Sequence, residues 1–469
     1  MIYLTAKKLN ILIILLIIVT YILSAILPFV RHKEVSEDFK RQVDAKNFYS
    51  DTIGSERVAY VKDNVEAMVY RLQMINEAKE EIILSTFDFN SDDSGKAMMS
   101  ALLHAADRGV NIRILVDGFS GLLDFTGNKW FLAFTSHENV HLKIYNPINL
   151  IKPWKLQARL HDKYLIIDDR MYLLGGRNTT NLFLGDYSPS KNIDKELFVY
   201  ETQTTLQTSL TQLKVYFEEV WNLPECKDYN AKKDRKDSEE YLELIEENDD
   251  LQETYPEMND KPDWLAKTME TNKITLIANP IEAENKEPEI WYTLNQLMLT
   301  GKEITIHTPY IICGDEMYED LTTLSQAVDS IQIITNDVTS GSNPWGCTDY
   351  LNQKNKILKT GVEVHEFLGK HSNHSKSILM DHRISVVGSY NLDMRSTYLD
   401  TELMLVVDSV ELNSILTAEA ETDMTYSKSI EAKEDYEYGE NYVEREFSAV
   451  KKVTYSLLRM LIIPIRRLL

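Results

Sequence analysis

The hydrophobic pattern begins with an uninterrupted apolar run near the N-terminus. Ile11–Val30 carries no charged residue. At about 1.5 Å per residue, a helix of this length spans the ~30 Å hydrocarbon core of a bilayer. A cleaved signal peptide is the alternative, but its apolar region is ordinarily shorter, and only Ser24-Ala25 suggests a cleavage site. We therefore predict a membrane anchor over residues 1–45, with its helix over about 11–30. It would be single-pass in the cell membrane, and basic residues on both sides leave its orientation open.

Beyond the anchor, helical and strand patterns alternate. Apolar residues recur at three- and four-residue steps between Val58 and Glu81, which predicts a helix. A second helical pattern covers Lys96–Arg108. Short apolar runs typical of strands cover Glu81–Phe87, Val110–Asp117, Val140–Tyr145 and Tyr164–Asp168. This alternation predicts an α/β domain.

The second half of the chain repeats the order of the first. Lys302–Pro309 matches Glu80–Thr86, Ile331–Asn336 matches Ile112–Asp117, and Gly361–Phe367 matches Val140–Tyr145 in role. Two such long units indicate a duplicated domain and not a short-period array. We predict an α/β fold with domains over residues 46–226 and 269–430.

Charge marks the two segments outside these domains. Residues 227–268 are dominated by charged side chains, which predicts a solvated linker or an exposed helix, with an acidic partner-binding segment as the alternative. In the tail, residues 431–469, Lys452, Arg459 and Arg466 recur every seven positions and form one stripe of a helix. A basic stripe beside a broad apolar face is typical of a helix on an anionic membrane, and a helix docked on the core is the alternative.

Composition narrows the class of protein. The 469 residues fit two domains, and a hydrophobic content of 43% is that of a globular protein. The net charge of −23 disfavours a protein whose main partner is nucleic acid. Three cysteines (Cys226, Cys313 and Cys347) are too few and too scattered for a disulfide framework or a zinc cluster.

One pattern of polar residues occurs twice with the same spacing. The first copy consists of His161, Lys163, Asp168, Gly175-Gly176 and Asn178, and the second of His374, Lys376, Asp381, Gly388-Ser389 and Asn391. Residues two apart on a strand share a face, so each histidine projects beside its lysine. An imidazole can attack phosphorus or carry a proton, while the ammonium neutralises phosphoryl oxygens. Each copy supplies one histidine and no nearby cysteine, which argues against a zinc site.

These residues resemble the two HKD motifs of the phospholipase D superfamily, and the likeness covers about Val58 to Asp408. Tyr145-Asn146-Pro147 before the first copy and Val215–Trp221 after it are similar to bacterial cardiolipin synthases, particularly the C-type. The run Gly388–Ser396, followed by Glu402, is similar to their GSxNxDxRS…E signature. The resemblance implies two phospholipase D-like α-β-α domains packed pseudo-symmetrically around one active site.

The resemblance also implies a two-step exchange at a phosphodiester, with no metal ion and no cofactor. The pseudo-symmetric copies leave the attacking histidine open. Analogy with the superfamily favours His161 as the nucleophile that forms a phosphohistidine and His374 as general acid and base. Glu196 and Glu402 would each orient one histidine. Glu402 is the stronger assignment, because 18 residues separate Asn178 from Glu196 and only 11 separate Asn391 from Glu402.

The remaining motif residues receive supporting roles from the same resemblance. Lys163 and Lys376 would neutralise phosphate, and Asn178, Ser389 and Asn391 would bind it. Asp168 and Asp381, on the opposite strand face from their histidines, would brace the motifs. Gly176 stands where the usual motif has serine, which removes one hydroxyl donor.

The resemblance, together with the anchor and the tail, implies a phosphatidyltransferase of the cardiolipin synthase type. Its substrates would be membrane phospholipids: phosphatidylglycerol, with phosphatidylethanolamine as a further candidate. Two rivals remain. One is a hydrolase of the same superfamily, either a phospholipase or a membrane-tethered nuclease. The other is a catalytically silent membrane scaffold.

Overall fold

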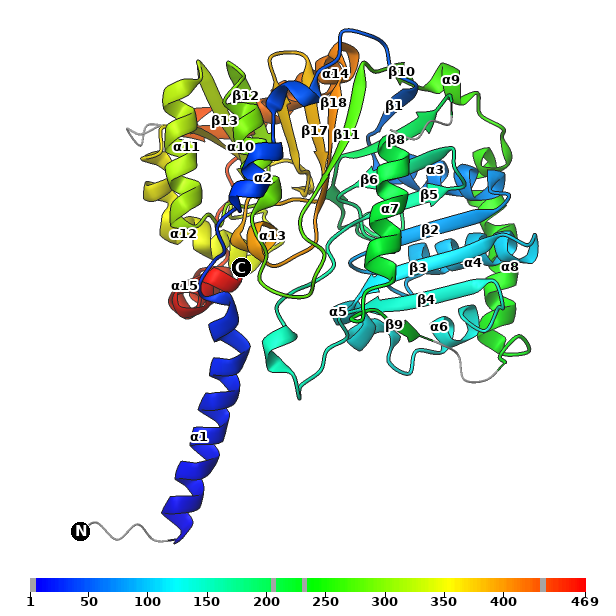
Figure 1. Ribbon diagram of the computed structural model, residues 1–469, viewed down its shortest axis with the longest axis horizontal. Helices are drawn as coiled ribbons and strands as arrows, with labels where there is room; N and C mark the ends of the chain where they lie inside the picture. The colour runs from blue at the N-terminus through cyan, green and yellow to red at the C-terminus, as the bar shows by residue number, and fades with distance from the viewer. Residues whose placement is uncertain (1–5, 204–207, 230–233, 431–435) are drawn as a thin grey trace.

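The computed structural model describes residues 6–203, 208–229, 234–430 and 436–469. Each half of the chain forms a mixed sheet of nine described strands, and the two sheets lie side by side (Figure 1). The first sheet has the order β10-β1-β8-β6-β5-β2-β3-β4-β9, and the second β11-β18-β17-β16-β12-β13-β14-β19-β20. The central strands correspond one to one, so the duplicated α/β architecture expected from the sequence is present.

The first domain alternates strands with covering helices. Its strands are β1 (Glu56–Val61), β2 (Glu81–Thr86), β3 (Asn111–Asp117), β4 (Val140–Tyr145), β5 (Tyr164–Ile167), β6 (Met171–Gly175), β7 (Asn192–Ile193), β8 (Glu196–Glu201) and β9 (Lys227–Tyr229). Its helices are α3 (Asn64–Glu77), α4 (Asp93–Asp107), α5 (Gly118–Ser120), η3 (Gly121–Phe125), α6 (Lys129–Phe134), η4 (Pro153–Lys155) and α7 (Ser209–Trp221). Strands β2, β3 and β4 are parallel, whereas β5, β6 and β8 run antiparallel to their neighbours.

The second domain repeats this arrangement. Its strands are β10 (Met269–Glu270), β11 (Lys273–Ala278), β12 (Glu303–His307), β13 (Ser330–Asn336), β14 (Glu363–Phe367), β15 (Ser372–Asn373), β16 (Ser377–Met380), β17 (Ile384–Gly388), β18 (Leu403–Asp408), β19 (Ser427–Ile430) and β20 (Tyr436–Tyr438). Its helices are α10 (Glu289–Met298), α11 (Asp315–Ala327), α12 (Pro344–Leu358), α13 (Met394–Tyr398) and α14 (Val410–Thr425). Strand β10 pairs with β1, so it completes the first sheet.

The helix predicted from Val58 starts later than the apolar spacing suggested. Glu56–Val61 is strand β1, which pairs antiparallel with β8. The side chain of Asp63 accepts a hydrogen bond from the Glu66 amide at 2.8 Å and caps α3. An aspartate at this position fixes the helix start, because it satisfies an otherwise unpaired backbone N–H.

The two domains share an apolar core where they meet. Leu213 and Phe217 of α7 and Leu412 and Leu416 of α14 are fully buried there, among side chains from both sheets. Separate cores lie on the other face of each sheet, beneath α3 and α4 in the first domain and α10 and α11 in the second. The shared core fixes the domains relative to each other, so residues of both can form one site.

The described part of the charged segment, residues 227–229 and 234–268, packs on the first domain. Strand β9 extends its sheet, and α8 (Glu239–Thr254) covers α4 and α6. Tyr241, Leu244 and Leu251 of α8 are buried in that core. Two short helices follow, η5 (Pro256–Asn259) and α9 (Trp264–Lys267). Helix α8 is therefore amphipathic, and its acidic residues form the outer face. The high charge of the whole segment made its buried apolar face hard to recognise in the sequence.

The N-terminal helix α1 (Ala6–Ile26) projects away from the domains (Figure 1). Residues Lys8–Phe29 are long and apolar enough to cross a membrane, and the apolar side chains from Ile11 to Leu23 are exposed. A short helix η1 (Leu27–Phe29) ends the apolar run, and Phe29 is buried in the second domain. Helices α2 (Glu37–Gln42) and η2 (Ala45–Phe48) lead to β1. The N-terminal helix is therefore joined to the second domain through Phe29.

The tail forms α15 (Ala449–Leu461) and η6 (Ile463–Leu468), beside the end of α1 where it meets the domains (Figure 1). Two residues of its basic stripe face the protein. Arg459 donates to Asn352 at 2.7 Å, and Arg466 pairs with Asp349 at 2.7 Å. The outward face is apolar instead, with six side chains between 54% and 77% exposed: Val450, Val453, Leu457, Met460, Leu461 and Ile463. The helix is docked, as in the alternative prediction, and its apolar face is the exposed one. The expected boundary at residue 431 lies outside the described residues.

Candidate active site

Each copy of the motif lies at the start of a buried hairpin. His161 and Lys163 immediately precede β5, which pairs with β6, and His374 and Lys376 immediately precede β16, which pairs with β17. Both lysines are about 1% exposed, and each donates to the backbone carbonyl of its own histidine. The Lys376 ammonium also lies 3.2 Å from Nε2 of His374.

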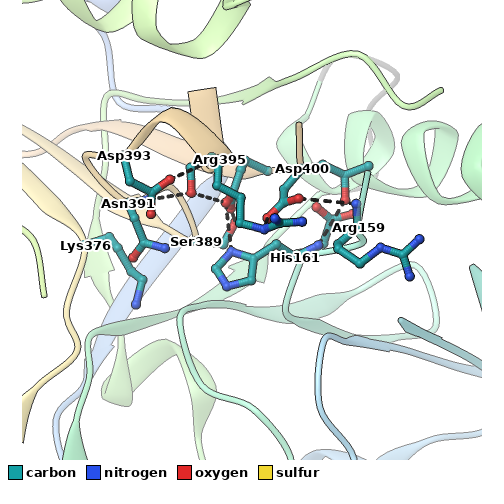
Figure 2. A network of polar contacts seen from close by, with 12 residues as sticks. Arg159, His161, Lys376, Ser389, Asn391, Asp393, Arg395 and Asp400 are labelled. Atoms are coloured by element: carbon teal, nitrogen blue, oxygen red, sulfur yellow. Dashed lines mark hydrogen bonds and ion pairs between the residues drawn. The ribbon is translucent and has the colours of Figure 1, made fainter. Parts of the chain in front are cut away.

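His161 of the first domain is held by a carboxylate of the second. Its Nδ1 lies 2.8 Å from Oε1 of Glu402, in a hydrogen bond that leaves Nε2 on the opposite side of the ring. The backbone amide of His161 donates to the Thr401 carbonyl, and that of Thr401 to the Arg159 carbonyl. This small parallel bridge fixes the distance between the two segments, and Figure 2 shows the network around His161.

His374 of the second domain is held by a carboxylate of the first. Its Nδ1 lies 2.7 Å from Oδ2 of Asp194, and its amide donates to the Ile193 carbonyl at 2.6 Å. Strand β15 pairs in parallel with β7 just before these residues. Each domain therefore supplies one histidine, and also the carboxylate that orients the histidine of the other domain.

Glu196, the carboxylate expected to orient a histidine in the first half, does not contact one. It accepts hydrogen bonds from Arg71 at 2.6 and 2.8 Å and lies 3.9 Å from Arg177. The strand register explains the correction. Gly175 is opposite Glu196, whereas Gly388 is opposite Met404, so the structural equivalent of Glu402 is Asp194. Matching Asp194–Leu197 to Asp400–Leu403 by sequence similarity pairs Glu196 with Glu402, two residues out of step with the strand pairing.

The difference between Gly176 and Ser389 follows from the same register. A Cβ atom on Gly176 would lie 2.4 and 2.5 Å from the two carboxylate oxygens of Asp194. In the second half, the Ser389 hydroxyl donates to Glu402. The side chain of Glu402 is one carbon longer than that of Asp194, so its carboxylate reaches the site from further back. Ser396 donates to the other oxygen of Glu402 at 2.6 Å. Ser389, expected to bind phosphate, therefore has its hydroxyl engaged in holding a carboxylate.

Asn178 and Asn391 remain available to a ligand. Both side chains are buried, and the Oδ1 atom of each has no hydrogen-bond partner among the described residues. Nδ2 of Asn391 donates to the Tyr310 hydroxyl at 3.2 Å. A buried amide oxygen without a hydrogen bond is unfavourable unless a ligand or a water molecule donates one to it.

Asp168 and Asp381 lie at the hairpin turns, away from the histidines. Their φ angles are 51° and 50°, in the left-handed region. Asp168 accepts hydrogen bonds from the amides of Glu80 and Glu81, both at 2.9 Å. Asp381 accepts from the amide of Glu303 at 2.9 Å, and from that of Lys302. These bonds tie each turn to the start of the neighbouring strand, β2 or β12, which is a bracing arrangement.

Burial sets the protonation of the site. It lowers the pKa of His374 to about 4, with Lys376 acting in the same direction, and the pKa of His161 well below its usual 6.5. Burial also lowers the pKa of Lys163 to about 7 and that of Lys376 to about 8. Both imidazoles are therefore neutral at neutral pH, the form that can attack phosphorus or accept a proton.

The pKa values of the two orienting carboxylates shift in opposite directions. Burial raises the pKa of Glu402 to about 8, against the opposing effect of Lys163. Burial would also raise the pKa of Asp194, but Lys376 and His374 together hold it below its usual value. The ionised carboxylate is therefore better stabilised beside His374 than beside His161. Within the described part of the chain, no group of three His, Cys, Asp or Glu side chains could hold a metal ion.

Comparison with protein families identifies the fold. A family model described as "Cardiolipin synthase, PLD-like domain" matches residues 72–221 and 293–424, more than half of the chain. The chain belongs to this family of the phospholipase D superfamily. The matched ranges include both histidines and both lysines of the duplicated motif. The protein is therefore an enzyme of the phospholipase D superfamily, and each of its two domains carries one copy of the duplicated motif.

Individual relatives are distant but cover most of the chain. An uncharacterised protein of Helicobacter pylori is 23% identical over 388 residues, which cover 74% of this chain and 75% of that protein. Cardiolipin synthase C of Escherichia coli is 23% identical over 403 residues, which cover 76% of this chain and 82% of that protein. The crystal structure of phosphatidylserine synthase of Haemophilus influenzae superposes with a TM-score of 0.63 at 15% identity, covering 92% of this chain and all of that one. At this identity, the structural likeness shows the fold alone.

Proposed function

We propose that this enzyme is a phosphatidyltransferase of the cardiolipin synthase type, which transfers a phosphatidyl group through a phosphohistidine to phosphatidylglycerol. The observation that carries the proposal is the reciprocal pair of His161 with Glu402 and His374 with Asp194. Each contact turns Nδ1 toward a carboxylate and leaves Nε2 for chemistry. One imidazole can then act as nucleophile while the other moves the proton.

In the first step, Nε2 of His161 attacks the phosphorus of one phosphatidylglycerol molecule. The P–N bond forms, the P–O bond to the glycerol headgroup breaks, and His374 donates a proton to the leaving oxygen. The pKa of His374 is low in the empty site, but an anionic phosphodiester beside both imidazoles raises it. Lys163, Lys376 and the asparagine amides stabilise the charge on the phosphoryl oxygens.

In the second step, His374 accepts a proton from a hydroxyl of a second phosphatidylglycerol molecule. That oxygen attacks phosphorus, the P–N bond to His161 breaks, and cardiolipin is released. The products of the two steps are therefore glycerol and cardiolipin, and no metal ion or redox partner is needed to balance them. If water enters instead, the same site hydrolyses the lipid to phosphatidic acid.

A lipid substrate is supported by features outside the motif. Helix α1 can hold the domains at a bilayer, where it would serve as a single-pass anchor in the cell membrane. The relatives named cardiolipin synthase and the fold neighbour named phosphatidylserine synthase suggest phospholipid donors and acceptors. The net charge of −23 works against nucleic acid as the substrate.

The test is a product analysis of the purified full-length protein in liposomes of phosphatidylglycerol, with and without phosphatidylethanolamine. We expect cardiolipin and glycerol in both mixtures. Phosphatidic acid without cardiolipin would instead indicate a hydrolase, and release of nucleotides from labelled single strands would indicate a nuclease. Absence of cardiolipin in both mixtures would contradict the transferase proposal.

A further inference from the structure

An apolar cavity of about 750 Å³ lies between the membrane helix and the first domain. One wall is the last two turns of α1, including Ile22 and Ile26. Leu122 of η3 and Leu156, which directly follows η4, line the cavity from the first domain. The C-terminal residues Leu468 and Leu469 contribute the third side. The volume is within the ~300–1,000 Å³ typical of ligand sites.

The inner end of this cavity reaches the catalytic centre. Phe87 lines the cavity, and its ring also packs edge-on against the imidazole of His161, with 5.4 Å between centroids. The Lys163 ammonium lies 5.7 Å from the same ring. A molecule in the cavity would therefore be separated from both catalytic groups by a single side chain or by none.

Two arginines line the cavity at this end. Arg159 is 2% exposed, and its Nε and Nη1 atoms make no hydrogen bond to any described residue, although Nη1 lies 3.6 Å from Asp117. Arg395 lies 3.1 Å from Asp400, which also accepts a hydrogen bond from the Arg159 amide (Figure 2). Arg395 also donates to the carbonyls of Gln157 and Leu468, so the buried guanidinium donor without a partner is Nε of Arg159. Such a donor favours an anionic ligand.

The arginine pair breaks the pseudo-symmetry of the enzyme. Arg159 stands two residues before His161, and Ser372 occupies the same place before His374. Arg395 stands four residues after Asn391, and Leu182 occupies the same place after Asn178. The motifs are duplicated, but the arginines and the apolar cavity occur on the His161 side. This side is therefore built for a ligand with one anionic and one apolar part.

The outer end of the cavity is continuous with the membrane helix. The α1 residues that line it lie in the last part of the Lys8–Phe29 segment, which is long and apolar enough to span a bilayer. Nearby residues of the first domain are also apolar and exposed: Phe119, Leu150 and Ile151 are 46%, 66% and 85% exposed. A lipid acyl chain that leaves the bilayer along α1 would enter the cavity without being exposed to water.

We propose that this cavity holds an acyl chain of the phospholipid whose phosphate reacts with His161, and that Arg159 and Arg395 bind the anionic part of that lipid. The proposal rests on the phosphatidyltransferase function and adds the place where the donor lipid enters. The enzyme draws its donor sideways from the bilayer, along α1.

The experiment is photolabelling of the full-length His374→Ala protein in liposomes that contain phosphatidylglycerol with a diazirine midway along one acyl chain. This variant lacks the proton carrier, so labelling reports binding and not turnover. We expect adducts on the peptides that contain Leu122 and Leu156. Leu156→Trp, which fills the cavity, should reduce them at least fivefold. Leu123→Trp, on a neighbouring side chain that is 72% exposed and does not line the cavity, should leave them unchanged.

Labelling confined to α1, or labelling of the Leu122 and Leu156 peptides that Leu156→Trp does not reduce, would overturn the proposal. Leu122→Trp changes a half-exposed side chain and supplies the same comparison if Leu156→Trp fails to fold. The outcome is separable from that of the product analysis. Labelling in the cavity without cardiolipin synthesis by the wild type would contradict the transferase function alone, and cardiolipin synthesis without this labelling would contradict the acyl site alone.

Discussion

Asp194 of the first domain lies 2.7 Å from Nδ1 of His374 in the second domain. Two residues later, Glu196 is buried and pairs with Arg71 and Arg177 instead. Two carboxylates on one short segment therefore have opposite duties. The first faces the active site, and the second balances buried positive charge in the core of its own domain. The side chains alternate along the chain, so a shift of two residues keeps the face but changes the neighbour.

Asn in place of Asp194 and Gln in place of Glu196 should separate these duties. Asp194→Asn removes the carboxylate that orients His374, and we expect kcat for cardiolipin synthesis to fall roughly 10²-fold. Glu196→Gln leaves Arg71 and Arg177 without a counter-charge, which costs about 3–5 kcal/mol of unfolding free energy. Activity per folded molecule should be kept. Equal loss of kcat in both variants at equal stability would contradict this assignment.

Gly176→Ser tests the reason for the glycine in the first motif. The added side chain would collide with the Asp194 carboxylate, so we expect His374 to lose its orientation and kcat to fall at least tenfold. The double variant Gly176→Ser with Asp194→Glu reproduces the Ser389–Glu402 pair of the second half and should recover part of the loss. A fully active Gly176→Ser protein would show that the position tolerates a side chain and that the register argument is wrong.

Much of this arrangement could be predicted from the sequence. The repeated order of strands and helices gave the duplicated α/β fold, because period-2 and period-3.6 patterns are local properties. Glu402 was also predicted, since the long signature around it fixed its position. Asp194 was not predicted, because Asp194–Leu197 can be matched to Asp400–Leu403 in two ways and only strand pairing distinguishes them. The signal that could have found it was the glycine at 176, which leaves room for a shorter carboxylate.

The tail shows a second limit of sequence patterns. The period of its basic residues correctly indicated one stripe of a helix, but a pattern cannot say which face meets the protein. Asp349 and Asn352, about a hundred residues earlier, bind two arginines of that stripe. These long-range partners hold the basic stripe against the second domain and leave the apolar face outward.

The exposed apolar face of α15 predicts contact with lipid. An environment-sensitive NBD label on Leu457→Cys should brighten and shift to the blue when the full-length protein is placed in liposomes. The three native cysteines are buried, so the engineered thiol reacts first. A label on Ile53→Cys, an exposed residue in the loop before β1 at the other end of the molecule from α1, is the control and should not change (Figure 1). Equal spectra at both positions would contradict contact between α15 and the bilayer.

His374 predicts a loss of stability in acid. Its folded-state pKa of about 4 lies below the 6.5 of an exposed histidine, so the unfolded chain binds more protons between these pH values. The contribution of this group to stability is complete above pH ~6.5 and falls by up to ~3 kcal/mol as the pH drops through 4. His374→Gln should therefore show a smaller drop in Tm between pH 7 and pH 4.5 than the wild type. Parallel curves would mean that the buried imidazole is not held neutral.

The central claim is that one histidine carries the phosphatidyl group while the other moves the proton. The most direct test is to quench the wild type and its two single alanine variants during turnover of phosphatidylglycerol, and to map adducts by mass spectrometry under alkaline conditions that preserve phosphohistidine. The account predicts a phosphatidyl adduct on the His161 peptide of the wild type, and neither this adduct nor cardiolipin with His161→Ala. With His374→Ala it predicts cardiolipin synthesis reduced at least 10²-fold. An adduct on His374 and none on His161, or cardiolipin synthesis that survives His161→Ala, would contradict it.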